Sequence, residues 1–338
     1  MGKQTAAAGI KKYIKFAGNA VCGVSVLFLM IALMRTEFDF SQVTNWRLFL
    51  FVFAVGTVFK TVTVFISASA WCFWLEFFAK RRCDRKMALR VYVKANIGKY
   101  LPGNVMHYVE RNLFAEKLEL SQKQIAAASV CEIVSLVLTA LFMGTFLAFS
   151  GMREVLLTVG EKVPVLHRFG HTLEEIVSGS VFTGWKVWLF FTAVILAALL
   201  SVFFSRYKNG SAKKQRIVKK KFCAADLFAC ILQFLRSFFL YAAVLLILGL
   251  TLVLLYWYLG GRPSVQQALE MAAAYIIAWV LGFIIPGAPG GIGVREMALT
   301  LLLTPVTGKD SIVVLSVLHR LITVAGDFAA YLTTISKR

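Results

Sequence analysis

Residues 224–258 read AADLFACILQFLRSFFLYAAVLLILGLTLVLLYWY, an apolar run whose charged residues are Asp226 and Arg236. A helix needs about 20 mostly apolar residues to cross roughly 30 Å of hydrocarbon, and this stretch exceeds that length. The whole chain of 338 residues has the same character, with 59% hydrophobic and 16% charged residues, where soluble proteins have about 25% charged residues. We therefore predict an all-α polytopic membrane protein that forms a single transmembrane domain over 1–338.

Further apolar stretches resemble this one. We predict six spanning helices, at about 16–34, 47–79, 121–149, 183–205, 224–258 and 310–335. Two more apolar segments, 86–118 and 264–304, are interrupted by Pro-Gly, and each is long enough for two half-helices but not for two crossings. A helix break at membrane depth persists where protein or a water-filled cavity covers the freed backbone groups. Both segments are therefore predicted to be re-entrant helical hairpins.

The distribution of charge predicts the orientation of the chain. The net charge is +20, but Lys and Arg cluster next to apolar spans, which is typical of cytoplasmic loops rather than of nucleic-acid binding. The N-terminus, the run 80–86, a basic loop at 206–221 and the C-terminus all fall on the cytoplasmic side if six helices cross. The outer loops then hold six of the 17 acidic residues, four of them in an interfacial loop at 151–182. We expect a multi-pass protein of the cytoplasmic (inner) membrane with both termini in the cytoplasm.

Metal and cofactor sites are not expected. The six cysteines lack zinc-type spacing and suit small apolar positions. His167 and His171 stand four residues apart with Glu175 one turn further on. That pattern could form a metal-binding face, but Gly170 weakens the helix that it requires.

The two interrupted segments resemble each other. Arg111 follows Pro102-Gly103 by nine residues, and Arg295 follows Pro286-Gly287 at the same distance. Further on, 129–132 (SVCE) matches 316–319 (SVLH), shifted by three residues relative to the Pro-Arg pair. We therefore predict two repeats, 47–149 and 224–335. They are inverted because two crossings, 121–149 and 183–205, lie between their long first helices, so that these helices cross in opposite directions. Inverted repeats with discontinuous helices are typical of transporters that alternate access to one site.

Proline and glycine at the hairpin tips have a mechanical role, because proline ends a helix and glycine allows a tight reversal. The following half-helix then points its N-terminus inward, where it favours anions. The alternative is helix packing through small residues. The tip residues are Pro102, Gly103, Pro286, Gly287, Pro289, Gly290, Gly291 and Gly293.

Arg111 and Arg295 are the strongest candidates for a binding site, because an arginine at membrane depth is costly and usually functional. A guanidinium also suits two-point contact with phosphate. Alternatively, each pairs with its neighbour, Glu110 or Glu296. Lys60 and Arg236, deep in their long helices, extend the phosphate site or are neutralised by Glu132 or Asp327. The candidate substrate-binding residues are Arg111, Arg295, Lys60, Arg236, Glu132, His319, Arg320 and Glu296.

The segment Pro289–Glu296, PGGIGVRE, resembles the PGG-(L/I)-G-V-x-E signature of the lysylphosphatidylglycerol synthase transmembrane region, or flippase-like domain, family. Pro102-Gly103 with Arg111, and Arg320 with Gly326, are similar to further motifs of that family. Met106 and Ile133 depart from it, since the family often has glycine and arginine there. The resemblance implies a stand-alone member without the soluble synthase domain.

This resemblance implies a lipid flippase, not an enzyme, that translocates an anionic lipid such as a polyprenyl-phosphate-linked sugar or a phospholipid. Its partners would be membrane lipids and a protein that makes or consumes the transported lipid. One alternative is a membrane glycosyltransferase or lipid-modifying enzyme with a lipid-phosphate donor, since Glu37-Phe38-Asp39 has a matching acidic spacing. Another is a lipid-binding protein that transports nothing.

Overall fold

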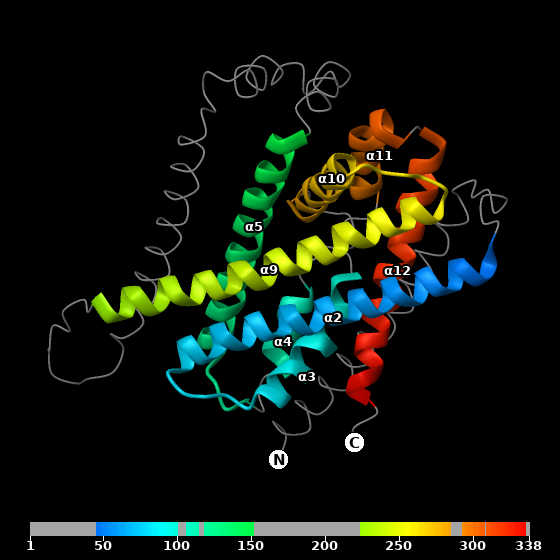
Figure 1. The fold of residues 1–338 in the computed structure, drawn as a ribbon. Coiled ribbons are helices and arrows are strands. Elements are labelled where there is room, and N and C mark those ends of the chain that lie inside the picture. The colour runs from blue at the N-terminus through cyan, green and yellow to red at the C-terminus, as the bar shows by residue number, and fades with distance from the viewer. Residues whose placement is uncertain are drawn as a thin grey trace, which may run out of the picture.

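The structure is a computed structural model, and it describes residues 45–100, 106–114, 118–151, 224–284, 293–307 and 309–335. These residues form helices and contain no strand (Figure 1). The helices are α2 (Trp46–Ala79), α3 (Arg85–Asn96), the 3-10 helix η2 (Ile97–Tyr100), α4 (Met106–Phe114), α5 (Gln122–Gly151), α9 (Ala224–Tyr258), α10 (Val265–Ile284), α11 (Val294–Thr307) and α12 (Lys309–Ile335).

Five of these helices, α2, α5, α9, α10 and α12, are long and apolar enough to cross a membrane. The prediction of an all-α membrane protein is therefore confirmed. Four of the five agree with predicted spans to within two residues. The fifth helix, α10, has 20 residues and is longer than the half-helix that we expected in the segment 264–304. The second helix of that segment, α11, has 14 residues.

Several predicted features lie outside the described residues. They are the spans 16–34 and 183–205, the outer loop beyond Gly151, the basic loop 206–221, both termini, and every hairpin-tip residue except Gly293.

The two longest helices, α2 and α9, lie side by side and run in opposite directions (Figure 1). Near the start of α2, the ring centroid of Phe49 is 5.7 Å from that of Tyr258, close to the end of α9. At the other end of the pair, the Arg236 guanidinium lies 5.8 Å from the ring centroid of Phe73. This antiparallel pair is the frame against which the other helices pack.

Helices α12 and α5 cross this frame at close range. A Cβ built on Gly326 of α12 would lie 2.5 Å from Cβ and Cγ of Lys60 on α2, so glycine is required for this approach. Gly144 of α5 faces α10 less tightly, since a Cβ there would meet Ile276 at 3.4 Å. The close crossing at Gly326 brings polar groups of α12 next to the middle of α2.

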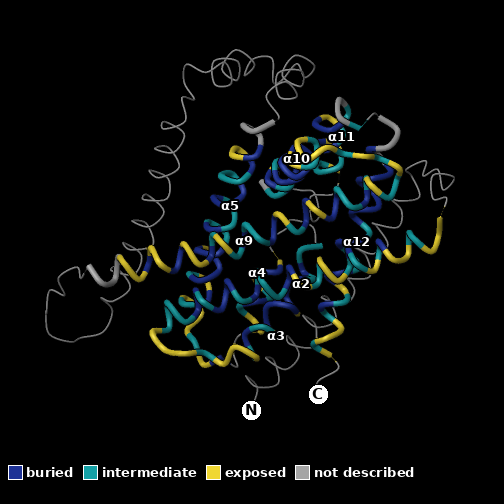
Figure 2. Tube along the Cα trace, in the orientation of Figure 1, coloured by how far each residue is buried: buried dark blue, intermediate teal, exposed yellow. Residues whose placement is uncertain are grey.

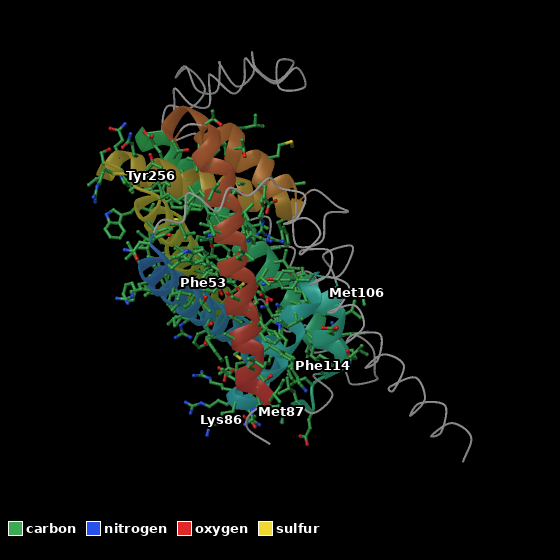
Figure 3. All side chains as sticks on the ribbon, turned by 90° about the vertical axis from the view of Figure 1, so that its right-hand side faces the viewer. Phe53, Lys86, Met87, Met106, Phe114 and Tyr256 are labelled. Carbon is green, nitrogen blue, oxygen red and sulfur yellow. The ribbon has the colours of Figure 1, made fainter. Side chains whose placement is uncertain are left out.

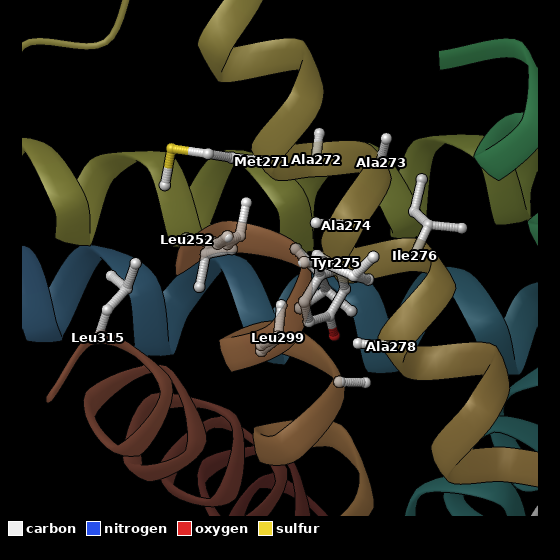
Figure 4. Close-up of a cluster of buried hydrophobic side chains, with 14 of the residues drawn as sticks. Leu252, Met271, Ala272, Ala273, Ala274, Tyr275, Ile276, Ala278, Leu299 and Leu315 are labelled. Carbon is white, nitrogen blue, oxygen red and sulfur yellow. The ribbon is translucent and has the colours of Figure 1, made fainter. Parts of the chain in front are cut away.

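The main hydrophobic core joins both halves of the chain. It contains residues of α2, α5, α9, α10, α11 and α12, and Figure 4 shows Leu252 of α9, Leu299 of α11 and Leu315 of α12 around the alanine-rich middle of α10. By contrast, large apolar side chains of α2 and α9 such as Phe51 and Phe239 are exposed, and Figure 2 shows exposed positions along both helices. Exposed apolar surface on this scale marks contact with an apolar environment, as expected for a membrane protein.

Side-chain caps fix where the helices begin. Asp84 accepts a hydrogen bond from the backbone N–H of Met87 at 3.1 Å and starts α3. Ser264 and Gln267 exchange hydrogen bonds of 2.9 and 3.2 Å at the start of α10, which is a capping box. These caps set where the first helix of each interrupted segment begins.

Candidate functional site

Arg111 of α4 forms a buried ion pair with Glu132 of α5. Both side chains are only 2% exposed, and the hydroxyl of Tyr92 on α3 donates a hydrogen bond of 2.9 Å to the second oxygen of Glu132. The partner of Arg111 is thus a carboxylate 21 positions away, and not the neighbouring Glu110 that we considered as an alternative. In this arrangement the charge of Arg111 is already neutralised.

Aromatic rings enclose the same guanidinium. Its Cζ lies 3.8 Å from the ring centroid of Tyr92, 5.0 Å from that of Tyr108 and 5.6 Å from that of Trp71. Cation–π contacts of this kind are strongest when the cation is desolvated. Arg111 therefore ties α4 to α2, α3 and α5.

Arg295 of α11 occupies the corresponding position in the second half, but its surroundings differ. Among the described residues, no carboxylate lies within 4 Å of its guanidinium, whereas the Nε atoms of Arg295 and Arg111 are alike in being buried without a hydrogen-bond partner. Gly282 of α10 makes room for it, since a Cβ there would lie 2.5 Å from Cγ of Arg295. The guanidinium Cζ lies 5.7 Å from the ring centroid of Trp279.

Glu296, next to Arg295, serves the backbone. Its Oε2 accepts a hydrogen bond of 2.6 Å from the N–H of Gly293, three residues earlier, as the acidic residue of a capping box does. Gly293 has a φ of +86°, which favours glycine. Glu296 therefore caps α11, and the predicted pairing of Arg295 with its neighbour is not observed.

His319 of α12 is also held by specific contacts. Its Nε2 lies 3.2 Å from the carbonyl oxygen of Leu248, and because a carbonyl only accepts, Nε2 carries the proton. The ring meets that of Tyr275 of α10 edge-on at 4.9 Å. Tyr275 is also close enough to Arg295 to interact with it electrostatically.

Each half thus contains a tyrosine, an arginine and a third polar residue. Tyr92, Arg111 and Glu132 are joined by a hydrogen bond and an ion pair. In the second half Tyr275 and His319 contact each other edge-on, and Arg295 interacts electrostatically with both. The third members, Glu132 and His319, are aligned in the repeat. The position of Glu132, whose carboxylate neutralises Arg111, is therefore occupied in the second half by His319, whose ring is neutral or cationic.

Asp327 of α12 is the centre of a third polar cluster. It is 1% exposed and lies 3.4 Å from Nζ of Lys60 and 2.6 Å from Nζ of Lys99. Asn96 donates a hydrogen bond of 2.8 Å to Oδ1 of Asp327, and the Tyr100 hydroxyl donates one of 2.5 Å to Oδ2. One carboxylate therefore serves two lysines, so that the cluster carries excess positive charge.

Two arginines add to this charge. Arg295 and the buried Arg320 both interact electrostatically with groups of the Asp327 cluster or with His319. The sequence predicted Lys60, Arg295 and Arg320 as site residues and offered Asp327 as a partner of Lys60. It missed Lys99, Asn96 and Tyr100. Their position just before Pro102-Gly103 was the available signal.

Arg236 is separate from this cluster. It is an exposed residue of α9 and contacts Phe73, which follows Lys60 by 13 residues in α2, or about 20 Å along the helix axis. The structure therefore does not bring Lys60 and Arg236 together.

Within the described ranges, no group of three or more His, Cys, Asp or Glu side chains is placed to hold a metal ion. His167, His171 and Glu175 lie outside those ranges.

Comparison with known proteins adds no family assignment. No protein-family model matches the chain, and no curated protein sequence matches it significantly. The resemblance of Pro289–Glu296 to the flippase-like signature therefore stays a prediction from the sequence.

Proposed function

We propose that this protein is a lipid flippase that moves an anionic, phosphate-bearing lipid across the membrane, such as a polyprenyl-phosphate-linked sugar or a phospholipid. The observation that carries the proposal is that Arg295, which Arg320 and Glu296 both influence electrostatically, has no carboxylate within 4 Å of its guanidinium in the described residues. Leaving such a charge unpaired in an apolar interior is costly. A phosphate group would supply the missing negative charge in two-point contact.

Comparison of the two halves strengthens this argument. Glu132 gives Arg111 its counter-charge, whereas His319 stands at the aligned position beside Arg295. In the proposed complex, the lipid phosphate supplies to Arg295 the negative charge that Glu132 supplies to Arg111. Lys60 and Lys99 gather around Asp327, and Arg295 acts electrostatically on Lys99, so the two lysines would add to the attraction of the phosphate.

The arrangement of neighbours supports an inverted repeat. Helix α2 packs against α12, and its counterpart α9 packs against α5. Likewise α5 contacts α10, and α12 contacts α3. Exchanging the two halves therefore preserves these neighbours, and α2 and α9 are antiparallel, as inversion requires. In transporters, such repeats rock around a site near the bilayer midplane.

In this mechanism the lipid phosphate binds at Arg295 while the apolar tail stays in the bilayer. The hairpins 86–118 and 264–304 would open the site to each side in turn. A functional partner that makes or consumes the lipid would set the direction. Glu37 and Asp39, on which the enzyme alternative rests, lie outside the described residues, and none of the contacts above favours group transfer.

The test is translocation of fluorescent phosphatidylglycerol, and of a short-chain polyprenyl-phosphate sugar, in proteoliposomes. Replacing His319 with glutamate should abolish transport, because the new carboxylate would neutralise Arg295 as Glu132 neutralises Arg111. His319→Gln keeps a donor for the Leu248 carbonyl and should retain transport. Arg295→Ala should also lose transport, whereas Arg262→Ala, at an exposed site, should not. Full transport by His319→Glu or Arg295→Ala would refute the proposal.

A further inference from the structure

The exposed surface of α3 is entirely basic. The residues of this helix classed as exposed are Arg85, Lys86, Arg90 and Lys94, and the others are partly or fully buried. Arg85 is engaged by Glu76 through two hydrogen bonds of 3.0 and 2.9 Å, and this contact raises the pKa of Arg85.

The other three cations share one face of α3. Lys86, Arg90 and Lys94 are spaced four residues apart, so each lies one turn beyond the previous one. Within the described residues, no carboxylate lies within 4 Å of any of them. This face therefore presents a row of three cations without a protein counter-ion in the described part of the chain.

The exposed face of the next helix, α4, is apolar. Met106, Val109, Leu113 and Phe114 are 37%, 46%, 42% and 40% exposed, respectively, while Arg111 on the opposite face is buried. Figure 3 shows Met106 and Phe114 on the same side of the helix bundle. An apolar face of this kind suits the acyl region of a bilayer.

The basic and the apolar face adjoin each other. Nζ of Lys94 lies 5.8 Å from the ring centroid of Phe114, so that the last cation of the row sits above the apolar face of α4. A ligand that covers both faces needs an anionic head joined to an apolar tail. A nucleic acid lacks the tail, and an acidic peptide would leave the apolar face uncovered.

We propose that the surface formed by Lys86, Arg90, Lys94, Met106, Val109, Leu113 and Phe114 binds an anionic phospholipid of the adjoining leaflet. Its phosphate contacts Arg90 and Lys94, and one acyl chain lies along α4. This site is distinct from the Arg295 site, and its lipid need not be the transported one. The surface anchors the first interrupted segment to anionic membrane.

The test measures binding of short-chain phosphatidylglycerol to the purified full-length protein by native mass spectrometry, with short-chain phosphatidylcholine as the neutral probe. Each basic residue near an anionic surface contributes about fivefold in affinity. The double variant Arg90→Gln/Lys94→Gln should therefore bind phosphatidylglycerol at least about fivefold more weakly, with phosphatidylcholine binding unchanged. The charge-preserving variant Arg90→Lys/Lys94→Arg should bind it like the wild type.

The matched control is Arg47→Gln/Arg262→Gln, which removes two exposed cations at the far end of the α2–α9 pair. It should keep wild-type affinity for phosphatidylglycerol. Unchanged affinity in the Arg90/Lys94 variant would overturn the proposal, and so would an equal loss in the control. His319→Glu should keep this affinity while it loses transport, so the two proposals fail independently.

Discussion

Replacing Glu132 with glutamine removes the counter-ion of Arg111 with little change in shape. The amide oxygen can still accept the hydrogen bond that Tyr92 donates, so the main loss is the negative charge. Arg111 and Glu132 are both 2% exposed, and water cannot readily solvate the guanidinium that remains. Breaking a buried ion pair on one side costs about 3–5 kcal/mol, and we expect Glu132→Gln to lose stability in that range.

A double-mutant cycle separates this effect from lost packing. Arg111→Met/Glu132→Gln removes both charges, and because an apolar replacement of a whole buried pair is often nearly neutral, it should be more stable than Glu132→Gln alone. The assay is unfolding of the purified protein in mixed micelles with increasing denaturing detergent. Tryptophan fluorescence reports it well, since Trp71 and Trp74 are buried beside the pair.

Two results would refute this reasoning. One is a stability of Glu132→Gln within about 0.5 kcal/mol of the wild type, the range of ordinary surface substitutions. The other is additivity of the two single variants, Arg111→Met and Glu132→Gln, because residues that contact each other should show a coupling energy of about 0.5–3 kcal/mol. Either result would mean that the two side chains do not form the buried pair.

Three further predictions follow from the packing. Gly326→Ala should destabilise the protein by about 1–3 kcal/mol through overpacking, because its Cβ would lie 2.5 Å from Lys60. The control Gly144→Ala, with its nearest contact at 3.4 Å, should be tolerated. Equal stability of the two variants in the same unfolding assay would contradict the prediction for Gly326. Asp327→Asn should lower the stability by about 3–5 kcal/mol, because two lysines lose their carboxylate partner. An unfolding midpoint equal to that of the wild type would instead show that water solvates the cluster. Gly293→Ala should lower the stability by about 1–2 kcal/mol from its positive φ alone, because no described atom beyond its chain neighbours lies within 4 Å of the new Cβ. An unchanged stability in the same assay would contradict this prediction.

Much of the helical architecture could be predicted because its signal is local. The apolar run 224–258 coincides with α9, and α2 begins one residue before its predicted span. Length and composition decide such helices, since a long apolar segment has few other stable states in a bilayer. The length of α10 was harder to predict, because α10 packs against α5 and α9, and such contacts between distant segments leave no local signal in the sequence.

The polar sites were only partly predictable. The sequence selected Arg111, Glu132 and Asp327, but the partner of each was left open. Pairing depends on which helices lie side by side, as Arg111 with Glu132 and Asp327 with Lys99 show. Lys99 was missed although it lies just before Pro102-Gly103, because its pairing with Asp327 depends on a helix far along the chain.

The sequence by itself determined that this chain is helical, apolar enough for a membrane, and carries an arginine nine residues after each Pro-Gly. Those properties depend on composition and spacing along the chain. Only the tertiary structure decided that Glu132 neutralises Arg111 while His319 stands near Tyr275 and Arg295. The reason is physical: the energy of a buried charge depends on the groups within a few ångströms of it, and those groups come from helices far apart in the sequence.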